Sequence, residues 1–427
     1  MTRSTGWTGP AAAPHGVLGN VRSLEGRFRR FRTKGAWFWI LLLLGAVIRI
    51  YFVTATPGTH DVTVWTVHAR YAHRFGLERF YARSEVSNHP PPIVRVLSSV
   101  WAAGEAAGLP FRISLRAPFA LLDLANALLI ALLLRGHPAR WVAAMAYWIA
   151  PLPTVFSAYH GNTDTAVAFF LLLSVFAASR QRLAWAGVVI GLGLWVKLPV
   201  ILALPALWFA SATGRERALL GLGVLGVASI GYAPALIGFP ELFFERVFGY
   251  PGLVATSHGG TPIWGLWNVA SAADRLPDSI GAIADLHLEY NSFLSLAPVV
   301  ALAWLRRDRR TGPELAWTLG ASLLLFYGLS MRLSFQYLAW AAPFVIFLGP
   351  VRYALFSLVV GGYVYAVYAY VCGNAFLQGP WDWIGHPYFN DPILRLRDAS
   401  VLLCLSLGVG AFVEAARRAP KQGDADA

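Results

Sequence analysis

Charged residues and cysteines are both scarce in this sequence of 427 residues. Only 13% of the residues are charged, whereas soluble domains carry roughly 25%, and this excludes an ordinary water-soluble protein. The two cysteines, Cys372 and Cys404, are far apart in the chain, and Cys404 falls inside an apolar run. This arrangement indicates neither a disulfide framework nor a metal cluster.

Acidic residues are the scarcer charged group, and the formal net charge is +13. The arginines lie mostly between apolar runs and are not gathered on one helix among stacking aromatic residues, so the charge does not indicate nucleic-acid binding. This distribution is typical of the positive-inside rule for membrane proteins, with 17 Trp and 16 Tyr residues available for interfacial belts.

Apolar residues, in contrast, are abundant: 57% of the chain is hydrophobic and the mean hydropathy is +0.54. Repeated apolar runs near twenty residues long match helices that cross a hydrocarbon layer about 30 Å thick. We therefore predict an all-α polytopic membrane protein with about twelve transmembrane helices. They are expected at residues 35–54, 117–134, 141–158, 165–179, 183–197, 199–211, 217–237, 291–305, 314–330, 336–349, 352–371 and 399–416.

The segment 93–108 is predicted to lie in the membrane interface. It is apolar but contains Arg95 and Glu105, and charges at mid-membrane are costly. With this choice the short basic loops fall on the cytoplasmic side, as do both ends of the chain. Residues 183–211 are long for one helix and short for two, so a shallow hairpin with its tip at residues 197–199 is expected.

Three regions follow from this topology. Residues 1–34 are rich in Gly, Pro, Ala and Arg and are predicted to be a flexible, basic cytoplasmic tail. Residues 35–416 are expected to form a single transmembrane domain whose first outer loop spans 55–116. Residues 417–427 are expected to form a second cytoplasmic tail. The first apolar run follows a long basic segment and is interpreted as a retained helix, not a cleaved signal.

The polar motifs then share the outer side of the membrane, as an outward-facing active site requires. Asp61 follows the first span directly, and a partly desolvated carboxylate there suits a general base. Asp164, beside His160 and Asn162, is expected to hold an acceptor or to orient Asp61. For both acids the alternative is a simple helix cap: Asp61 would cap a helix that begins at Val62, and Asp164 one that begins at Thr165.

Several other residues are candidates for binding. The NHPPP motif stiffens the chain and directs His89 toward a cleft, or serves only as the entry to the interfacial helix. Lys197, Arg332 and Arg116 are suited to a lipid phosphate, or to anchoring at the interface. His258 in the SHGG motif is interpreted as part of a lid or as a solvated loop residue.

The order of these pieces resembles the GT-C superfamily of membrane glycosyltransferases. The matching motifs are GTHD, SNHPPPI, SLRAPFALLD, YHGNTDTAVAFFLL, GLGLWVKLP and RLSFQYLAW. The similarity is strongest to enzymes that use polyprenyl- or dolichyl-phosphate-linked sugars: dolichyl-linked glucosyltransferases, GPI mannosyltransferases and bacterial mannosyltransferases. HGNTD and RLSFQY differ from the eukaryotic motifs HGHFQYN and VHEK, which indicates a prokaryotic lineage and a bacterial plasma membrane.

The resemblance implies transfer of a hexosyl group, mannosyl by family likeness, from a polyprenyl-phosphate-sugar donor to a lipid-linked or cell-envelope glycan, with inversion. It implies Asp61 as base and Asp164 as the second acid. It implies no certain cofactor and leaves a divalent cation open. A multi-helix transporter or lipid flippase is the alternative, because it shares the helices but needs mid-membrane charges and repeats. Candidate donor- or acceptor-binding residues are His60, Asn88, His89, His160, Asn162, Lys197, His258, Arg332, Gln336 and Tyr337.

Overall fold

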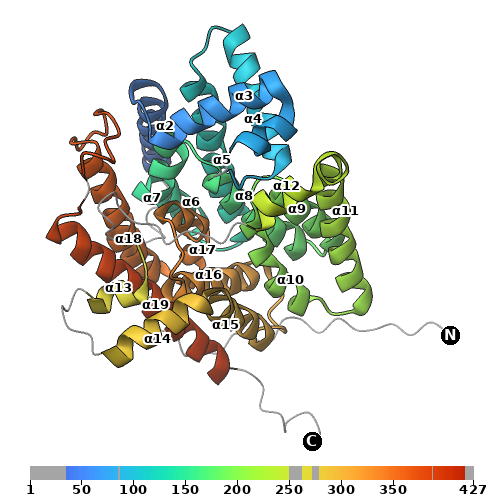
Figure 1. The fold of residues 1–427 in the computed structure, drawn as a ribbon. Helices are drawn as coiled ribbons and strands as arrows, with labels where there is room; N and C mark the ends of the chain where they lie inside the picture. The colour runs from blue at the N-terminus through green and yellow to red at the C-terminus, as the bar shows by residue number, and fades with distance from the viewer. Residues whose placement is uncertain (1–34, 85–86, 250–261, 272–277, 387, 419–427) are drawn as a thin grey trace, which may run out of the picture.

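The computed structural model describes residues 35–84, 87–249, 262–271, 278–386 and 388–418. Within these ranges the chain forms helices and no β-strand, which confirms the prediction of an all-α fold. The tail predicted for residues 1–34, most of the tail at 417–427, and His258 lie outside the described residues. In Figure 1, α8 (Asp164–Ser179), α16 (Gly312–Leu329) and α17 (Ala342–Val345) lie in the middle of the bundle. They are surrounded by α2 (Ala36–Ala55), α11 (Gly214–Gly238), α15 (Asn291–Leu305) and α18 (Pro350–Val371).

In the described part of the chain, five helices are long and apolar enough to cross a membrane, and up to seven spans result if each of two bent pairs counts as one. The predicted count of about twelve is therefore not confirmed. The five are α2 (Ala36–Ala55), α5 (Phe111–Leu133), α11 (Gly214–Gly238), α18 (Pro350–Val371) and α19 (Asp391–Arg417). One bent pair joins α6 (Arg140–Ile149) to α7 (Pro151–Thr154) and the π-helix η2 (Val155–His160); the other joins the end of α14 (Asp278–Glu289) to α15 (Asn291–Leu305).

The remaining apolar helices are shorter because prolines and polar residues interrupt them. Lys197 lies between α9 and η3, where the hairpin tip was predicted. The backbone groups freed there find protein partners: the Trp195 carbonyl accepts from the Ile93 N–H (3.1 Å) and the Leu194 carbonyl from the Tyr232 hydroxyl (2.5 Å). These helices are α8 (Asp164–Ser179), α9 (Leu183–Leu194), η3 (Leu198–Ala203), α10 (Leu204–Ala210), α16 (Gly312–Leu329), η5 (Phe335–Trp340), α17 (Ala342–Val345) and η6 (Ile346–Leu348).

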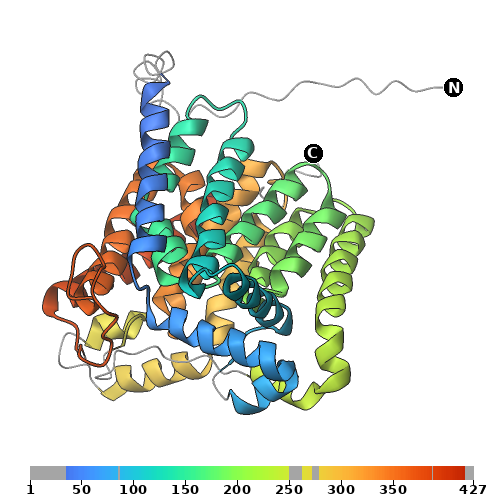
Figure 2. The same ribbon diagram turned by 90° about the horizontal axis from the view of Figure 1, so that it is seen from above.

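Helices too polar or too short to span the membrane gather at one end of the bundle. Figure 2 shows α3 and α14 lying across the end opposite to the one where α2 begins. Helix α3 packs on α4, so the first loop holds two helices, in agreement with the prediction of interfacial helices there. The helices outside all candidate spans are α3 (His60–Arg83), α4 (Pro91–Ala106), α12 (Pro240–Phe243), the π-helix η4 (Phe244–Phe248) and α13 (Leu266–Ser271), whereas α14 belongs to a span only if its bent pair with α15 counts as one.

A buried ion pair joins α2 to α5 inside the bundle. The guanidinium of Arg49 contacts the Asp123 carboxylate at 2.8 Å and lies over the Trp148 ring. Asp123 also accepts hydrogen bonds from the hydroxyls of Ser157 (2.6 Å) and Tyr147 (2.8 Å). Opposite charges within apolar helices are tolerated because they neutralise one another and satisfy each other's hydrogen bonds. This network fixes η2 against the first two spans.

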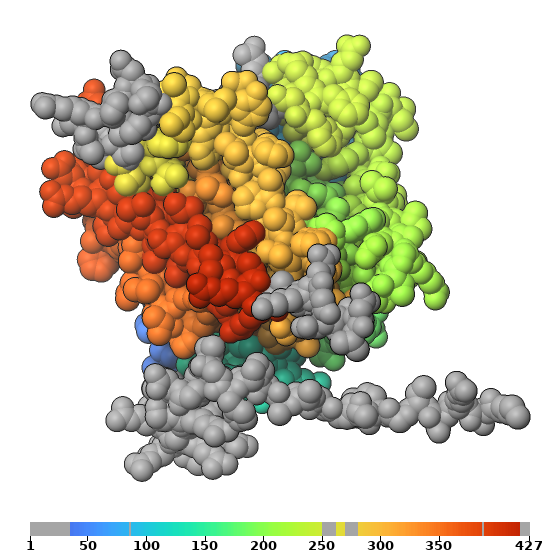
Figure 3. Space-filling view, turned by 90° about the horizontal axis from the view of Figure 1, so that it is seen from below, coloured from blue at the N-terminus to red at the C-terminus, as the bar shows by residue number. Residues whose placement is uncertain are grey.

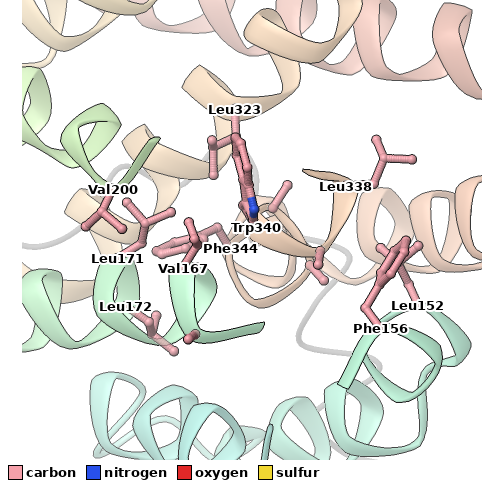
Figure 4. Packing of buried hydrophobic residues seen from close by; sticks show 14 of the residues in the cluster. Leu152, Phe156, Val167, Leu171, Leu172, Val200, Leu323, Leu338, Trp340 and Phe344 are labelled. Atoms are coloured by element: carbon pink, nitrogen blue, oxygen red, sulfur yellow. The ribbon is translucent and has the colours of Figure 1, made fainter. Parts of the chain in front are cut away.

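The core lies between α8, α16 and the short helices that follow α16. Figure 4 shows the Trp340 ring among Leu323, Val167 and Phe344, with Leu171 close by, and all five side chains are buried. The outer faces of the long helices are also apolar. Ile230, for example, is 69% exposed on α11. Figure 3 shows α15 beside α19 on one face of the molecule, with α11 at the far edge of the same face.

Candidate active site

Two glycine turns bring the first loop and the HGNTD motif together. Gly58 (φ +82°) and Gly161 (φ +77°) both adopt left-handed backbone conformations, and a Cβ on either would clash with Val62. Only glycine allows this close approach without strain. The turns are joined by the Thr59 hydroxyl, which donates to the His160 carbonyl (2.8 Å).

Asp61 lies at this junction, with its carboxylate held from the opposite turn. Oδ2 accepts from the Asn162 amide (2.6 Å) and lies 3.1 Å from Nε2 of His160. The helix cap is Thr59, whose hydroxyl accepts from the Asp61 N–H (3.3 Å). Asp61 is therefore not the helix cap that the sequence offered as an alternative. Its side chain remains 36% exposed, so a second molecule can reach it.

The surroundings of Asp61 favour the ionised carboxylate. Burial raises its pKa, but the charge of His160, the hydrogen bonds from His160 and Asn162, and the charge of Lys197 outweigh this and lower the pKa to about 2. Asp61 is thus a carboxylate, a proton acceptor, throughout the physiological pH range.

His160 is oriented by a contact on its other ring nitrogen. Nδ1 is hydrogen bonded to the Tyr368 hydroxyl of α18. His160 is the last residue of η2, and π-helical segments commonly occur at functional sites because they redirect side chains.

Asp164 and Lys197 form a second, more buried pair beside Asp61. Their side chains meet at 2.8 Å, and Asp164 is 1% and Lys197 9% exposed. The Trp340 indole N–H donates to the same Asp164 oxygen (2.8 Å), and the Lys197 ammonium lies over the Tyr337 ring. The cap of α8 is Thr163, so Asp164 is not a helix cap either. Asp164 positions Lys197 instead of contacting Asp61.

His89 lies on the other side of this cluster, at the entry to α4. Its ring packs against Trp65 of α3, with 4.3 Å between centroids and an angle of 38° between the ring planes. Burial, followed by the charges of Lys197 and His68, lowers the pKa of His89 to about 3, although Asp61 opposes the shift. The imidazole is therefore neutral. Among the described residues, neither Nδ1 of His89 nor Oδ2 of Asp164 has a hydrogen-bond partner, so two buried polar atoms remain to be satisfied.

The other candidate residues have weaker connections to the cluster. His60 is exposed and Asn88 is half-buried. The backbone N–H of Arg332 donates to the Ser330 hydroxyl (3.3 Å), and Gln336 accepts from the Ser334 hydroxyl. The side-chain partners of the Asp61 carboxylate are instead His160 and Asn162 of the HGNTD motif.

Arg116 holds the end of α2. The guanidinium is fully buried and donates to the carbonyls of Val53 (2.9 Å) and Thr56 (2.8 Å), at the C-terminus of that helix. Those carbonyls have no partner within the helix itself. Of the two interpretations offered for Arg116, the structure supports anchoring, because its donors are taken up by the backbone.

Neither cysteine forms a disulfide, as predicted. In the part of the chain that the structure describes, no three His, Cys, Asp or Glu side chains are grouped to hold a metal ion. The cluster instead offers one exposed carboxylate, one neutral imidazole and one lysine ammonium. These groups are suited to proton transfer and to binding an anion.

A comparison with protein families decides the family. The sequence model of glycosyltransferase family 87 matches residues 89–329, more than half of the chain. The chain belongs to glycosyltransferase family 87. This is a membrane family of the GT-C type, so the resemblance seen in the sequence is confirmed, and the protein is a membrane glycosyltransferase. No curated protein matches the chain.

Sequence reasoning about this glycosyltransferase missed two residues of the site. Tyr368 and Trp340 hold His160 and Asp164 from α18 and η5. Trp340 belongs to the RLSFQYLAW motif, whose spacing offered a signal, whereas Tyr368 is one of several tyrosines in an apolar run. Asp61 and both of these residues lie outside the range matched by the family model.

Proposed function

We propose that this enzyme transfers a hexosyl group, mannosyl by family likeness, from a polyprenyl-phosphate-sugar to a lipid-linked or cell-envelope glycan, with inversion. The observation that carries the proposal is the Asp61 carboxylate, partly exposed and fixed by His160 and Asn162. The reaction takes place at the outer face of a bacterial plasma membrane, within one catalytic domain formed by residues 35–416.

In this mechanism Asp61 accepts the proton of the acceptor hydroxyl. The hydroxyl oxygen attacks the anomeric carbon, the bond to the donor phosphate breaks, and the configuration at that carbon inverts. A carboxylate of low pKa is a weak base for a resting alcohol. It suffices here because the hydroxyl becomes strongly acidic as its oxygen bonds to carbon. The contacts of His160 and Asn162 with Asp61 fix the orientation of its carboxylate, and this matters because a misplaced base accelerates the reaction much less.

Lys197 and His89 are proposed to bind the donor phosphate. The structure shows one hydrogen bond from the Lys197 ammonium, to Asp164, and an ammonium carries three hydrogens. A neutral His89 contributes a hydrogen bond without a charge. The charge of Asp61 acts on both groups and favours the protonated form of each. The leaving phosphate is thereby stabilised next to the base.

An apolar groove beside these residues supports a lipid-linked donor. It has a volume of about 380 Å³ and lies between α4 and α11. Pro91, which follows His89 by two positions, and Trp195, which precedes Lys197 by two, both line it. A phosphate bound by His89 and Lys197 thus has an apolar surface next to it for an isoprenoid chain. The remaining lining residues are Leu77, Pro92, Arg95, Val96, Ser99, Ile230, Gly231 and Pro234.

The test is transfer activity of the purified protein in lipid nanodiscs, with labelled polyprenyl-phosphate-mannose as donor and membrane lipids as acceptors. Wild-type protein should form a glycosylated product of inverted configuration. Asp61→Asn keeps the shape of the side chain but not its basicity, and should lower the rate by about 100-fold or more. Asp308→Asn, in an exposed loop, is the matched control and should retain full activity.

Equal rates for Asp61→Asn and the wild type would show that Asp61 is not the base. Product formed only from a nucleotide-linked sugar would disprove the lipid donor. Movement of the labelled lipid across the bilayer without any product would favour the flippase alternative.

A further inference from the structure

An aromatic surface lies in the loop that packs over the residues holding the proposed base, and it has no role in the mechanism above. It is formed by Trp381 and Trp383 in the loop of residues 372–390, which joins α18 to α19. The two rings are parallel, with centroids 5.9 Å apart and an angle of 6° between their planes. Both side chains are only partly buried, and Asp382 between them is exposed. We name Trp381 and Trp383 the tryptophan platform.

The platform is connected to Asp61 through a short series of ring contacts. Trp381 packs on Tyr368 (5.1 Å between centroids), and Trp383 packs on Phe335 (6.2 Å). Tyr368 and Phe335 both contact the His160 ring, at 5.7 and 6.4 Å. His160 in turn holds the Asp61 carboxylate. The platform is therefore separated from the proposed base by two layers of side chains.

The loop that carries the platform is firmly attached to the bundle. Three tyrosine hydroxyls donate to its backbone: Tyr51 to the Phe376 carbonyl (3.0 Å), Tyr370 to the Tyr388 carbonyl (3.0 Å), and Tyr365 to the Ala375 carbonyl. The Asp382 carboxylate accepts from the Gly385 N–H (2.7 Å) and closes the turn after the platform. Because the loop is fixed in this way, the two rings are preorganised and a ligand need not order them.

Packing alone does not explain this arrangement. A loop that only covers the bundle requires apolar bulk, which aliphatic side chains supply, and it would bury that bulk. Here two large rings stay partly exposed over the buried aromatic side chains that pack on His160. Aromatic faces carry a partial negative charge and attract the weakly positive C–H groups of a sugar ring, while neighbouring polar groups bind its hydroxyls.

We propose that the tryptophan platform is a binding site for a sugar ring of the acceptor glycan. The platform binds the C–H face of a pyranose, and Asp382 accepts a hydrogen bond from one of its hydroxyls. The glycan then extends from the platform toward Asp61. This inference rests on the proposed function, because it assigns to the glycan acceptor of that same reaction a binding surface outside the Asp61 cluster.

The first experiment measures binding without catalysis. Protein labelled with 5-fluorotryptophan is placed in lipid nanodiscs, and its fluorine NMR spectrum is recorded during titration with methyl α-mannopyranoside or methyl α-glucopyranoside. The resonances of the platform are assigned as those lost in Trp381→Phe and Trp383→Phe. They should shift and saturate, whereas the resonance of Trp185, which is 60% exposed on α9, should not move.

The second experiment separates stacking from packing by kinetics. Trp383→Leu keeps apolar bulk but removes the aromatic face, and should raise the KM for the acceptor about fivefold to tenfold. The donor KM should stay unchanged. Trp383→Phe keeps a smaller ring and should restore much of the loss. Phe376→Leu is the matched control, since this ring lies in the same loop and is 69% exposed.

The outcomes distinguish this inference from the proposed function. Shifts of the platform resonances without any sugar transfer from the lipid donor would support the platform and refute the donor. Sugar transfer with no shift at the platform, or with an unchanged acceptor KM in Trp383→Leu, would refute the platform alone. Equal loss of activity in the Leu and Phe variants, with donor and acceptor KM unchanged, would reduce the platform to packing.

Discussion

The Lys197 ammonium and the Asp164 carboxylate form a buried ion pair at 2.8 Å, although they lie 33 positions apart in the sequence. The pair connects the start of α8 to the break between α9 and η3. It thus places a positive charge next to Asp61 without leaving that charge unpaired in the absence of substrate.

A double-mutant cycle tests whether this pair is structural or also functional. Lys197→Met leaves the Asp164 carboxylate buried and unpaired, and should lower the free energy of unfolding by about 3 to 5 kcal/mol. Adding Asp164→Asn should restore most of that stability but not the donor KM, which we expect to rise at least tenfold in both variants. A double variant with normal donor KM would show that Lys197 has no part in donor binding.

The contact between His160 and Asp61 predicts that replacing His160 changes the pH dependence of kcat/KM. In the wild type, the Asp61 pKa of about 2 keeps kcat/KM independent of this group above roughly pH 4. His160→Phe keeps a ring in place but removes the charge and the hydrogen bond. Burial is then opposed less strongly, the pKa of Asp61 rises, and the acid limb of residual kcat/KM should move to higher pH. His137→Phe, in an exposed loop, is the control, and identical profiles for both variants would contradict the expectation.

The low pKa of His89 predicts that acid destabilises the protein. The unfolded chain binds a proton at His89 near its ordinary pKa of 6.5, whereas the folded chain does so only near 3. The stabilising contribution is complete above about pH 6.5 and is lost as pH falls toward 3. The midpoint temperature of thermal unfolding in nanodiscs should therefore fall as the pH is lowered from about 7 to 5. In His89→Gln this temperature should depend less on pH. An unchanged slope in His89→Gln would show that other groups cause it.

Replacing Arg116 should affect stability and leave donor binding unchanged. Arg116→Met removes hydrogen bonds to the last carbonyls of α2 and should lower the free energy of unfolding by about 2 to 4 kcal/mol. The same change at Arg112, exposed one turn earlier on α5, should have little effect. A selective rise in donor KM for Arg116→Met would restore the phosphate-binding interpretation.

Much of the helical structure could be predicted from apolar periodicity. Residues 291–305 form the expected helix, α15. Helix α8 begins at Asp164, one position before the predicted start at residue 165. The start of α19 was missed by eight residues because its first turns are polar. Asn390 caps that helix by accepting from the Ile393 N–H, with a proline in the first turn. This is a local signal that the sequence does contain.

The partners of the site residues could not be predicted in the same way. The motifs placed Asp61, His160, Asn162, Asp164 and Lys197 on one side of the protein. Which of them meet depends on the π-helical turn at His160 and on the packing of α18 and η5, and neither leaves a periodic trace in the sequence. The predicted count of about twelve spans is not confirmed, because several apolar helices, such as α8 and α9, are shorter than a full span.

The buried pair of Arg49 and Asp123 has a consequence for how the chain enters the membrane. Arg49 lies in the first span and its partner 74 positions later, in α5. A single arginine in a newly inserted helix is costly until a carboxylate neutralises it. We therefore expect the first span to remain beside the translocation channel during synthesis until α5 emerges, so that the two helices enter the lipid together.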